Sequence, residues 1–254
     1  MTSQNAPRTA RARARAELTR EIAEEARRQL AATGANGLSL RAVASELGMV
    51  SSALYRYYPS RDDLLTVLII DAYNAMGEAA EAAIADAGRP GEPSARTRWL
   101  AACHAVRRWA LANPHEYALI YGSPVPGYRA PEATIGPAAR VPLAFSGVLA
   151  AAIAAGEITA AADPGPAAAD PGPAAADPGP DALTGQLAEQ AATLSALLGS
   201  EIPSGVVVRA VVAWTQLFGM LSFELFGQFV GSFEPADAFF AHAVDQLATF
   251  VGLP

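Results

Sequence analysis

One short segment of this chain, residues 46–65, concentrates side chains that can bind phosphates and base edges. Residues 55–58 are three tyrosines and an arginine in a row, and Gly48 and Pro59 leave room for only one short helix between them. A helix of about two turns is not stable by itself in water, so neighbouring elements must hold it. Phenol hydroxyls and guanidinium groups can reach phosphate oxygens and base edges in nucleic acids.

The residues around this segment have the spacing of a helix-turn-helix motif. Such a motif needs a small residue where its helices touch, a glycine at the turn and an apolar residue that fixes the second helix. Here these are Ala44, Gly48 and Leu54. Ser39 is a suitable N-cap for the first helix, and Gly48 ends it. The outer face of the second helix would then be free to enter a major groove.

The stretch 38–65, LSLRAVASELGMVSSALYRYYPSRDDLL, resembles the DNA-binding domain of the tetracycline-repressor (TetR) family of transcriptional regulators. A later stretch, 113–128, NPHEYALIYGSPVPGY, resembles a subgroup of that family called the WHG type. The resemblance implies a homodimeric DNA-binding regulator, most simply a repressor. It would bind a palindromic operator and be released by a small-molecule effector whose identity is unknown.

The resemblance also implies roles for individual residues. Tyr55 and Tyr57 would contact the DNA backbone, and Arg61 would pair with a phosphate at the start of the following helix. Serines and the arginine between the tyrosines would face base edges. The complete predicted DNA-binding set is Ser39, Arg41, Ser51, Ser52, Tyr55, Arg56, Tyr57 and Arg61.

Val50 and Tyr58 lie at the two ends of the recognition helix, which is the second helix of the motif, and their residue types are unusual for the family. Val50 stands where the family usually has serine or threonine, so the helix is expected to begin with Ser51 or Ser52 as its cap. Tyr58 takes a position that is usually apolar and lies on the inner face, so it is expected in the core.

Charge is distributed unevenly along the 254 residues. The net charge is −7, but residues 1–61 carry ten arginines and only five acidic residues. This asymmetry indicates a basic head that faces DNA or another anion, joined to an acidic body. Residues 1–16 are expected to form a flexible basic arm, which either reaches DNA phosphates or only aids solubility.

Composition and periodicity predict an all-α fold. Apolar residues make up 52% of the chain, and many are alanine, the strongest helix former. We expect a three-helix helix-turn-helix head at 17–65, followed by a larger helical domain for effector binding and dimerisation at 66–254. The expected helices cover roughly 16–32, 39–47, 60–88, the region of Trp99 and Trp109, 114–121, 132–155, 183–198, 203–230 and 235–251.

Residues 160–182 contain three Asp-Pro-Gly-Pro units seven residues apart. Proline and glycine in every unit are incompatible with a helix, so this segment is expected to be a flexible linker or surface loop.

Two sets of residues in the body have candidate roles. Aromatic and histidine side chains in the central helices either line an effector pocket or belong to the core: Trp99, His104, Trp109, Tyr117, Tyr121 and Phe145. The helix at 203–230 is apolar on all sides, so it is buried on both faces, either between two subunits or inside a monomer. The predicted dimer interface is Val207, Val211, Trp214, Phe218, Leu221, Leu225, Phe239, Val244 and Leu247.

Several other classes of function find little support in the sequence. Cys103 is the single cysteine, and the three histidines lack metal-ligand spacing, so no disulfide, metal site or cofactor is predicted. No nucleophile elbow, dinucleotide fingerprint or phosphate loop indicates an enzyme. The longest uncharged stretch, 141–156, is too short to span a bilayer, and no secretory signal is recognisable. We therefore expect a bacterial cytoplasmic, nucleoid-associated protein.

Two alternatives to a repressor remain open from the sequence. The helix-turn-helix could belong to an architectural protein that binds DNA without sequence preference, or to a transcriptional activator. Binding that depends on charge alone would weaken strongly as salt rises.

Overall fold

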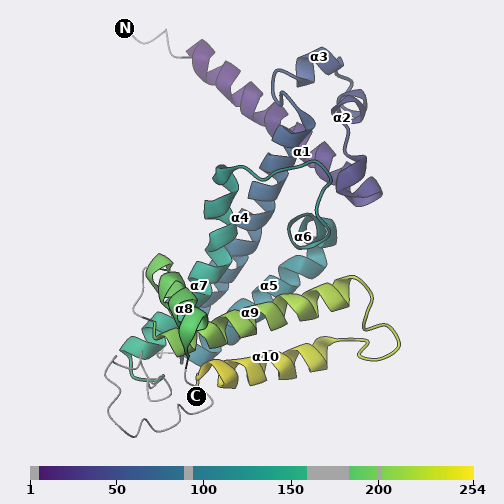
Figure 1. Ribbon diagram of the computed structural model, residues 1–254. Helices are drawn as coiled ribbons and strands as arrows, with labels where there is room; N and C mark the ends of the chain where they lie inside the picture. Colours follow the sequence, from purple (N-terminus) through teal and green to yellow (C-terminus); the bar gives the residue numbers. More distant parts are fainter. Residues whose placement is uncertain (1–5, 89–93, 159–182, 199–201) are drawn as a thin grey trace, which may run out of the picture. The chain divides into compact units, whose positions relative to one another are not determined.

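The computed structural model describes residues 6–88, 94–158, 183–198 and 202–254, and all regular secondary structure in them is helical (Figure 1). The prediction of an all-α protein is therefore confirmed. The helices are α1 Ala6–Gly37, α2 Leu40–Glu46, α3 Ser51–Leu54, α4 Arg61–Ala87, α5 Ala95–Ala112, α6 Pro114–Tyr121, the 3-10 helix Glu132–Thr134, α7 Ile135–Ala154, α8 Gly185–Leu197, α9 Ser204–Leu225 and α10 Asp237–Val251. The predicted Asp-Pro-Gly-Pro linker lies outside the described residues.

The chain divides into two compact units. The first contains Met1–Ala75 and Ala112–Ala138, and the second contains Met76–Leu111 and Ala139–Pro254. This division differs from the predicted boundary after residue 65, because α6 and the loop after it belong to the first unit. Apolar side chains in that segment, including Leu119 and Val125, pack against the core of the head.

The core of the first unit is formed by the apolar faces of its first four helices. Leu54 is fully buried, and it fixes the single turn of α3 to the rest of the head. A helix this short is stable only because its neighbours hold it. The buried residues of this core are Ile22, Ala23, Ala26, Leu30, Leu38, Leu40, Val43, Ala44, Leu54, Tyr58, Leu64, Leu65 and Leu68.

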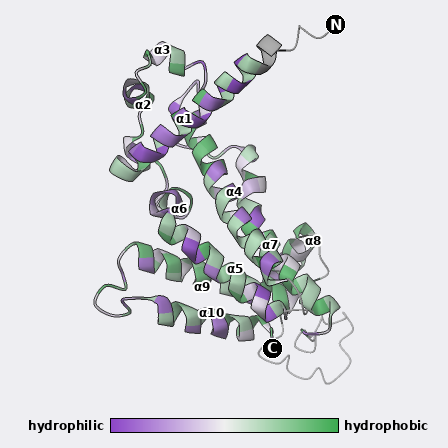
Figure 2. Ribbon diagram, turned by 180° about the vertical axis from the view of Figure 1, so that it is seen from behind, coloured by the Kyte–Doolittle hydropathy of each residue, from purple (hydrophilic) through white to green (hydrophobic). Residues whose placement is uncertain are grey.

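Residues 6–16 differ from the flexible arm that the sequence suggested at residues 1–16, and residues 1–5 lie outside the described residues. Helix α1 already begins at Ala6, and hydrophilic positions recur along it (Figure 2). Alanine and arginine are both strong helix formers, so an alternating run of the two favours a helix even without an apolar stripe. The regular helix is interrupted at Gly34, whose φ is +68°.

In the second unit, α9 packs against both α8 and α10, and Figure 1 shows α9 and α10 side by side. A buried arginine, Arg107 of α5, connects these helices. Its guanidinium donates to Glu224 of α9 at 2.6 Å and to Asp237 at the start of α10 at 3.0 Å. The charge of Arg107 is thus compensated by Glu224, whose side chain is 15% exposed, and by the exposed Asp237.

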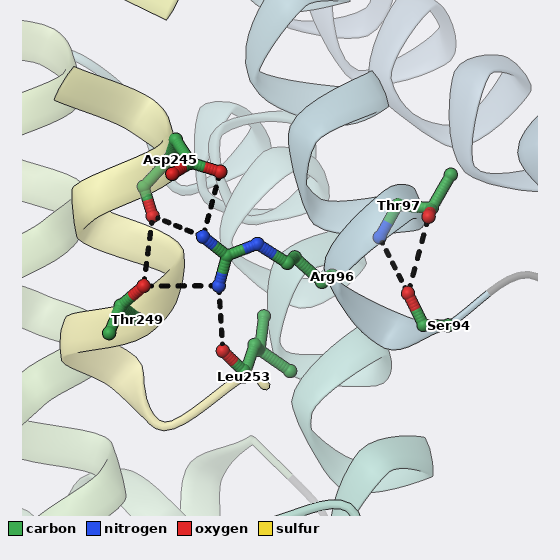
Figure 3. A network of polar contacts seen from close by, with 6 residues as sticks. All are labelled: Ser94, Arg96, Thr97, Asp245, Thr249 and Leu253. Carbon is green, nitrogen blue, oxygen red and sulfur yellow. Dashed lines mark hydrogen bonds and ion pairs between the residues drawn. The ribbon is translucent and has the colours of Figure 1, made fainter. Parts of the chain in front are cut away.

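A second arginine, Arg96, joins the start of α5 to the end of α10 (Figure 3). One terminal nitrogen donates to the Asp245 carboxylate at 2.7 Å and to the Asp245 carbonyl at 3.0 Å. The other donates to the Leu253 carbonyl at 2.9 Å and to the Thr249 hydroxyl at 3.1 Å. Arg96 thus bonds one carbonyl inside α10 and one two residues after its end, and it ties this part of the chain to α5.

Two helical segments, Glu132–Ala154 and Ser204–Leu225, are long and apolar enough to cross a membrane by length and composition. The second segment contains Arg209 and Glu224 and is therefore not an uncharged stretch. Core helices of soluble proteins have the same length and composition, so this is weak support for a membrane location.

Candidate nucleic-acid interface

The helix-turn-helix geometry follows from a cap and a glycine. The Ser39 side chain accepts a hydrogen bond from the Ala42 amide at 3.5 Å, so it caps α2 as predicted. Gly48 has a φ of +64°, a conformation that other residues rarely adopt. The chain turns there, and the Met49 amide donates to the Ala44 carbonyl at 2.8 Å.

The recognition helix α3 is shorter than expected and starts differently. It covers only Ser51–Leu54, and residues 55–57 continue it as a turn. The predicted serine cap is wrong, because Val50 occupies the N-cap position in an extended conformation and makes no side-chain cap bond. The Val50 carbonyl instead accepts from the Ala53 amide at 2.9 Å.

The eight predicted DNA-binding side chains divide equally between exposed and half-buried positions. Arg41, Ser52, Tyr55 and Arg56 are exposed, and Tyr55 retains 43% of its accessible surface. Ser39, Ser51, Tyr57 and Arg61 are half-buried. The exposed group lies on or next to α2 and α3, which brings guanidinium, hydroxyl and phenol groups to one motif.

Tyr58 lies in the core, in agreement with the sequence. It is 5% exposed, and its hydroxyl donates to the Thr19 carbonyl of α1 at 3.5 Å. Burial raises the pKa of Tyr58, and the nearby Asp71 raises it further, so the phenol stays protonated.

Arg61, predicted to pair with a phosphate, also makes contacts within the head. Its guanidinium donates to the Ala35 carbonyl at 2.7 Å and to the Leu38 carbonyl at 3.2 Å. These carbonyls lie where α1 ends and the chain turns toward α2. Arg61 thus fastens the start of α4 to this turn. In a sequence, an arginine that binds a phosphate looks the same as one that binds backbone carbonyls. Spacing alone therefore does not distinguish the two roles.

Arg15 is a candidate interface residue that is not in the predicted DNA-binding set. Its guanidinium carbon lies 4.8 Å from the centroid of the Tyr57 ring, and a terminal nitrogen donates to the Arg56 carbonyl at 3.4 Å. The side chain itself is exposed. The alternation of arginine and alanine at 11–16 could have indicated Arg15. Only a helix in this segment, however, brings Arg15 next to the turn after α3.

Ion pairs fix the helices behind this motif. Arg27 of α1 donates to Asp71 of α4 at 2.7 Å and to Glu116 of α6 at 3.0 Å. Burial raises the pKa of the Asp71 carboxyl, and the Arg27 charge opposes that rise. One arginine therefore connects three helices of the first unit.

The predicted effector residues separate into different surroundings. Trp99 and Phe145 lie together in the second unit, with ring centroids 4.7 Å apart, and both line a cavity of about 240 Å³. His104 instead packs against Phe240 of α10 at 5.5 Å, and Trp109 is not among the described residues that line the cavity. Pocket residues and core residues share the same helical spacing, which is why the sequence could not separate them.

The two predicted tyrosines of the pocket belong to the first unit and not to this cavity. Tyr117 is fully buried, and its ring centroid lies 5.2 Å from that of Tyr121. Tyr121 also meets Tyr73 of α4 at 6.1 Å. Burial raises the pKa of the Tyr121 hydroxyl, so this aromatic cluster remains uncharged.

The nine residues of the predicted dimer interface are divided between buried and accessible positions. Four of its members are buried within the chain and three line the cavity, but Val211 still retains 43% of its accessible surface, so contact with a second copy stays a prediction. The buried ones are Val207, Phe218, Leu221 and Val244; Val207, Val211 and Trp214 line the cavity; Leu225, Phe239 and Leu247 are half-buried. A helix that is apolar all round does not reveal from its sequence which face turns inward.

The opposite face of α9 is exposed and carries apolar residues on either side of Gln216. Val212 retains 39% of its surface and Phe223 retains 53%, and both lie on the same side of the helix as Gly219. We call Val212, Gly219 and Phe223 the outer face of α9. Apolar residues this exposed on a regular helix mark a surface that can bind another apolar surface.

The comparisons with known proteins identify the family. Residues 20–68 match the family of bacterial regulatory proteins called tetR, and residues 99–247 match the tetracyclin repressor-like C-terminal domain. The HTH-type transcriptional regulators Rv1816 of Mycobacterium tuberculosis and Mb1846 of Mycobacterium bovis are each 39% identical over 221 residues, which covers 85% of this chain and 84% of theirs. The chain therefore belongs to the TetR family of transcriptional regulators.

Solved structures agree with this assignment. SCO4313 aligns with a TM-score of 0.68 at 34% identity, covering 93% of this chain and 98% of that chain. A protein of unknown function from Rhodococcus sp. RHA1 aligns with a TM-score of 0.64 at 24% identity, covering 93% and 95% of the two chains, and shows the fold alone. The helix-turn-helix of the first unit is thus the DNA-binding motif of a transcriptional regulator.

Proposed function

We propose that this protein is a dimeric repressor that binds a palindromic operator and is released by a small-molecule effector. The observation that carries the proposal is the α2–turn–α3 motif, whose exposed Arg41, Ser52, Tyr55 and Arg56 accompany a buried Leu54. One face of this motif is packed on the core of the head and the other is exposed, which is the arrangement needed to enter a major groove. We infer a regulator without catalytic activity that acts on DNA in the cytoplasm of a bacterium.

Within the motif we propose a division of roles. Arg56 and Ser52 read base edges, since both are exposed on or directly after α3. Tyr55, Tyr57, Arg41 and Arg15 contact the sugar-phosphate backbone and set the position of α3. Ser39 caps α2, and Ser51 begins α3. For Arg61 we propose that it fastens the start of α4, since the Ala35 and Leu38 carbonyls accept from two of its five N–H groups, and the predicted phosphate contact is the alternative.

For the dimer we propose the outer face of α9. An ideal Cβ placed on Gly219 would meet no described atom within 4 Å, so the backbone is open to a close neighbour there. Val212 and Phe223 flank this opening and would be buried by a second copy of the same helix. A twofold axis through such a face gives an isologous contact, and it presents two heads to two half-sites.

We propose that the effector acts through the continuity of α4. This helix, Arg61–Ala87, starts in the first unit and ends in the second. Two half-sites in adjacent major grooves are about 34–36 Å apart, so a small change in the separation of the heads lowers operator affinity. An effector that binds one arrangement more tightly shifts the population toward it.

The decisive experiment is selection of fragments of the source genome by the purified full-length protein at physiological salt. Enrichment of one palindromic sequence supports the proposal, and reporter expression with and without the protein then separates a repressor from an activator. Retention of all DNA alike, lost as salt rises, would support the architectural alternative and contradict the proposal.

A further inference from the structure

The first turns of α1 extend beyond the core of the head and carry an excess of positive charge. Figures 1 and 2 show these turns standing clear of α2, α3 and α4. Residues 6–16 contain four arginines and no acidic residue, and residues 10–17 are all exposed. The first acidic residue of the chain, Glu17, pairs with Arg20 at 2.8 Å. This part of α1 therefore presents a basic surface to the solvent.

Two of these arginines lie on the side of α1 that faces the core further along the helix. Arg15 and Arg11 precede the fully buried Ile22 by about two and about three helical turns. At about 100° per residue, both lie within about 20° of the direction of Ile22, whereas Arg13 points to the opposite side. The side of α1 that is apolar against the core thus carries arginine where the core ends. We call Arg11 and Arg15 the basic stripe of α1.

The basic stripe is continuous with the DNA-binding motif. The Arg15 guanidinium carbon lies 4.8 Å from the centroid of the Tyr57 ring, and a terminal nitrogen donates to the Arg56 carbonyl at 3.4 Å. Both partners belong to the turn that follows α3. Arg11 lies one turn further along the same side of α1, at a distance of about 6 Å along the helix axis.

Duplex DNA is the partner whose charge and spacing suit this stripe. The phosphates of one strand follow each other about every 3.4 Å along the duplex axis, so two guanidinium groups about 6 Å apart can reach the same strand. Guanidinium groups bind phosphate oxygens through charge-assisted and often bidentate hydrogen bonds. The residues between the arginines at 11–15 are alanines, whose small side chains offer little apolar surface to another kind of partner.

From these observations we propose that the basic stripe of α1 binds the sugar-phosphate backbone of duplex DNA beside the segment that α3 enters. The contact adds affinity without sequence preference and lengthens the stretch of DNA that each subunit covers. This inference deepens the proposed function, and it rests on that proposal for the placement of α3 in a major groove.

The salt dependence of binding to a duplex of arbitrary sequence tests the stripe without an operator. The probe is a fluorescein-labelled, non-palindromic duplex, titrated with the full-length protein at several NaCl concentrations. Loss of one phosphate contact reduces the slope of log K against log salt by about 1. We expect Arg11→Gln to reduce the slope by about 1 for each bound subunit.

Arg13→Gln is the matched control for this measurement. It removes the same charge from an exposed position on the opposite side of the same helix, so the slope should stay close to that of the unsubstituted protein. An unchanged slope in Arg11→Gln would overturn the inference. Equal reductions in the two variants would also overturn it, because they would mean that only net charge matters.

Ala12→Pro separates a helical stripe from a flexible charged tail. Proline is tolerated at the first position of a helix, so α1 can begin at residue 12 while the turns before it lose their helical hydrogen bonds. Every charge is kept, but Arg11 is no longer held in line with Arg15. The slope should fall as it does in Arg11→Gln, and a slope equal to that of the unsubstituted protein would contradict the stripe. Positions 11–13 are exposed, so circular dichroism should show the same unfolding midpoint for all three variants.

Hydroxyl-radical footprinting on an operator selected from the genome locates the contact. The unsubstituted protein and Arg13→Gln should protect backbone positions that Arg11→Gln leaves open, with no change in the preferred sequence. Identical protection by all three proteins would contradict the placement of the stripe. The two proposals fail separately, because absence of an enriched palindrome contradicts the proposed repressor, whereas the slopes on the arbitrary duplex decide whether the stripe binds DNA.

Discussion

The guanidinium of Arg15 lies over the ring of Tyr57, 4.8 Å from its centroid. This contact joins α1 to the turn that follows the recognition helix, and Arg15 also donates to the Arg56 carbonyl. A positive charge is thereby held beside two side chains that we propose to contact DNA. The N-terminal helix is part of the candidate interface.

We therefore expect Arg15→Ala to weaken operator binding about two- to fivefold through loss of the cation–π contact, which is worth about 0.5–1 kcal/mol at an exposed site. Fluorescence anisotropy with a labelled operator fragment measures this. Arg13→Ala, on the same helix and without a contact to α3 among the described residues, should have a smaller effect. Equal losses in the two variants would mean that only net charge matters.

Arg61→Ala should reduce the stability of the protein. The substitution removes two hydrogen bonds from a charged donor to the Ala35 and Leu38 carbonyls, and these side-chain bonds are partly exposed, so we expect a loss of about 1–3 kcal/mol. Denaturant unfolding monitored by circular dichroism gives the change. Arg41→Ala is the matched control, because Arg41 is exposed and should affect DNA binding without changing stability. Unchanged stability in Arg61→Ala, with a reduced salt slope, would restore the phosphate role.

Arg56→Ala should relax sequence preference at one position of each half-site. A bidentate arginine–base contact contributes about 1–3 kcal/mol of discrimination, so the preferred operator should lose about that much while altered sequences lose less. Competition between operator variants measures the ratio. A uniform loss across all sequences would show that Arg56 contacts phosphate instead.

Gly219→Leu should disrupt the dimer without harming the fold. The new side chain meets no described atom at Cβ, and leucine favours a helix more than glycine does, so the subunit should remain folded. Analytical ultracentrifugation should show a shift toward monomer, and Phe223→Glu on the same face should do the same.

Leu221→Ala provides the contrast to these variants of the outer face. Leu221 is fully buried inside the subunit, so its truncation should cost about 2–5 kcal/mol of stability. A dimer that survives both Gly219→Leu and Phe223→Glu would rule out the outer face of α9 as the contact.

His104 should make the protein less stable as the pH falls. Burial lowers the pKa of His104 below its ordinary value of 6.5, and Arg108 and Arg107 lower it further. Between the folded pKa and 6.5, the unfolded chain binds more protons than the folded chain, so stability decreases as pH decreases through that window. Unfolding from about pH 7.5 to about pH 5 should show a smaller slope for His104→Gln. His242→Gln, an exposed histidine on α10, serves as the control.

The sequence by itself determined the elements that depend on local interactions. Ser39 and Ser60 cap α2 and α4 because a hydroxyl can satisfy free amides at a helix start; the Ser60 oxygen accepts from the Asp63 amide at 3.1 Å. Pro114 and Gly122 mark the bounds of α6 for similar reasons. The spacing of Ala44, Gly48 and Leu54 indicated the helix-turn-helix before any packing was known.

Only the tertiary structure decided which partner each longer-range side chain meets. Arg61 bonds two carbonyls, and Tyr121 joins Tyr73 in the first unit, although both residues had other predicted roles. The inward face of α9 was also undecided, since its apolar residues surround the helix. The periodicity of a helix shows how polar each of its faces is, but it does not show which other element packs against that face. That is fixed when segments far apart in the sequence compete to bury the same apolar surface.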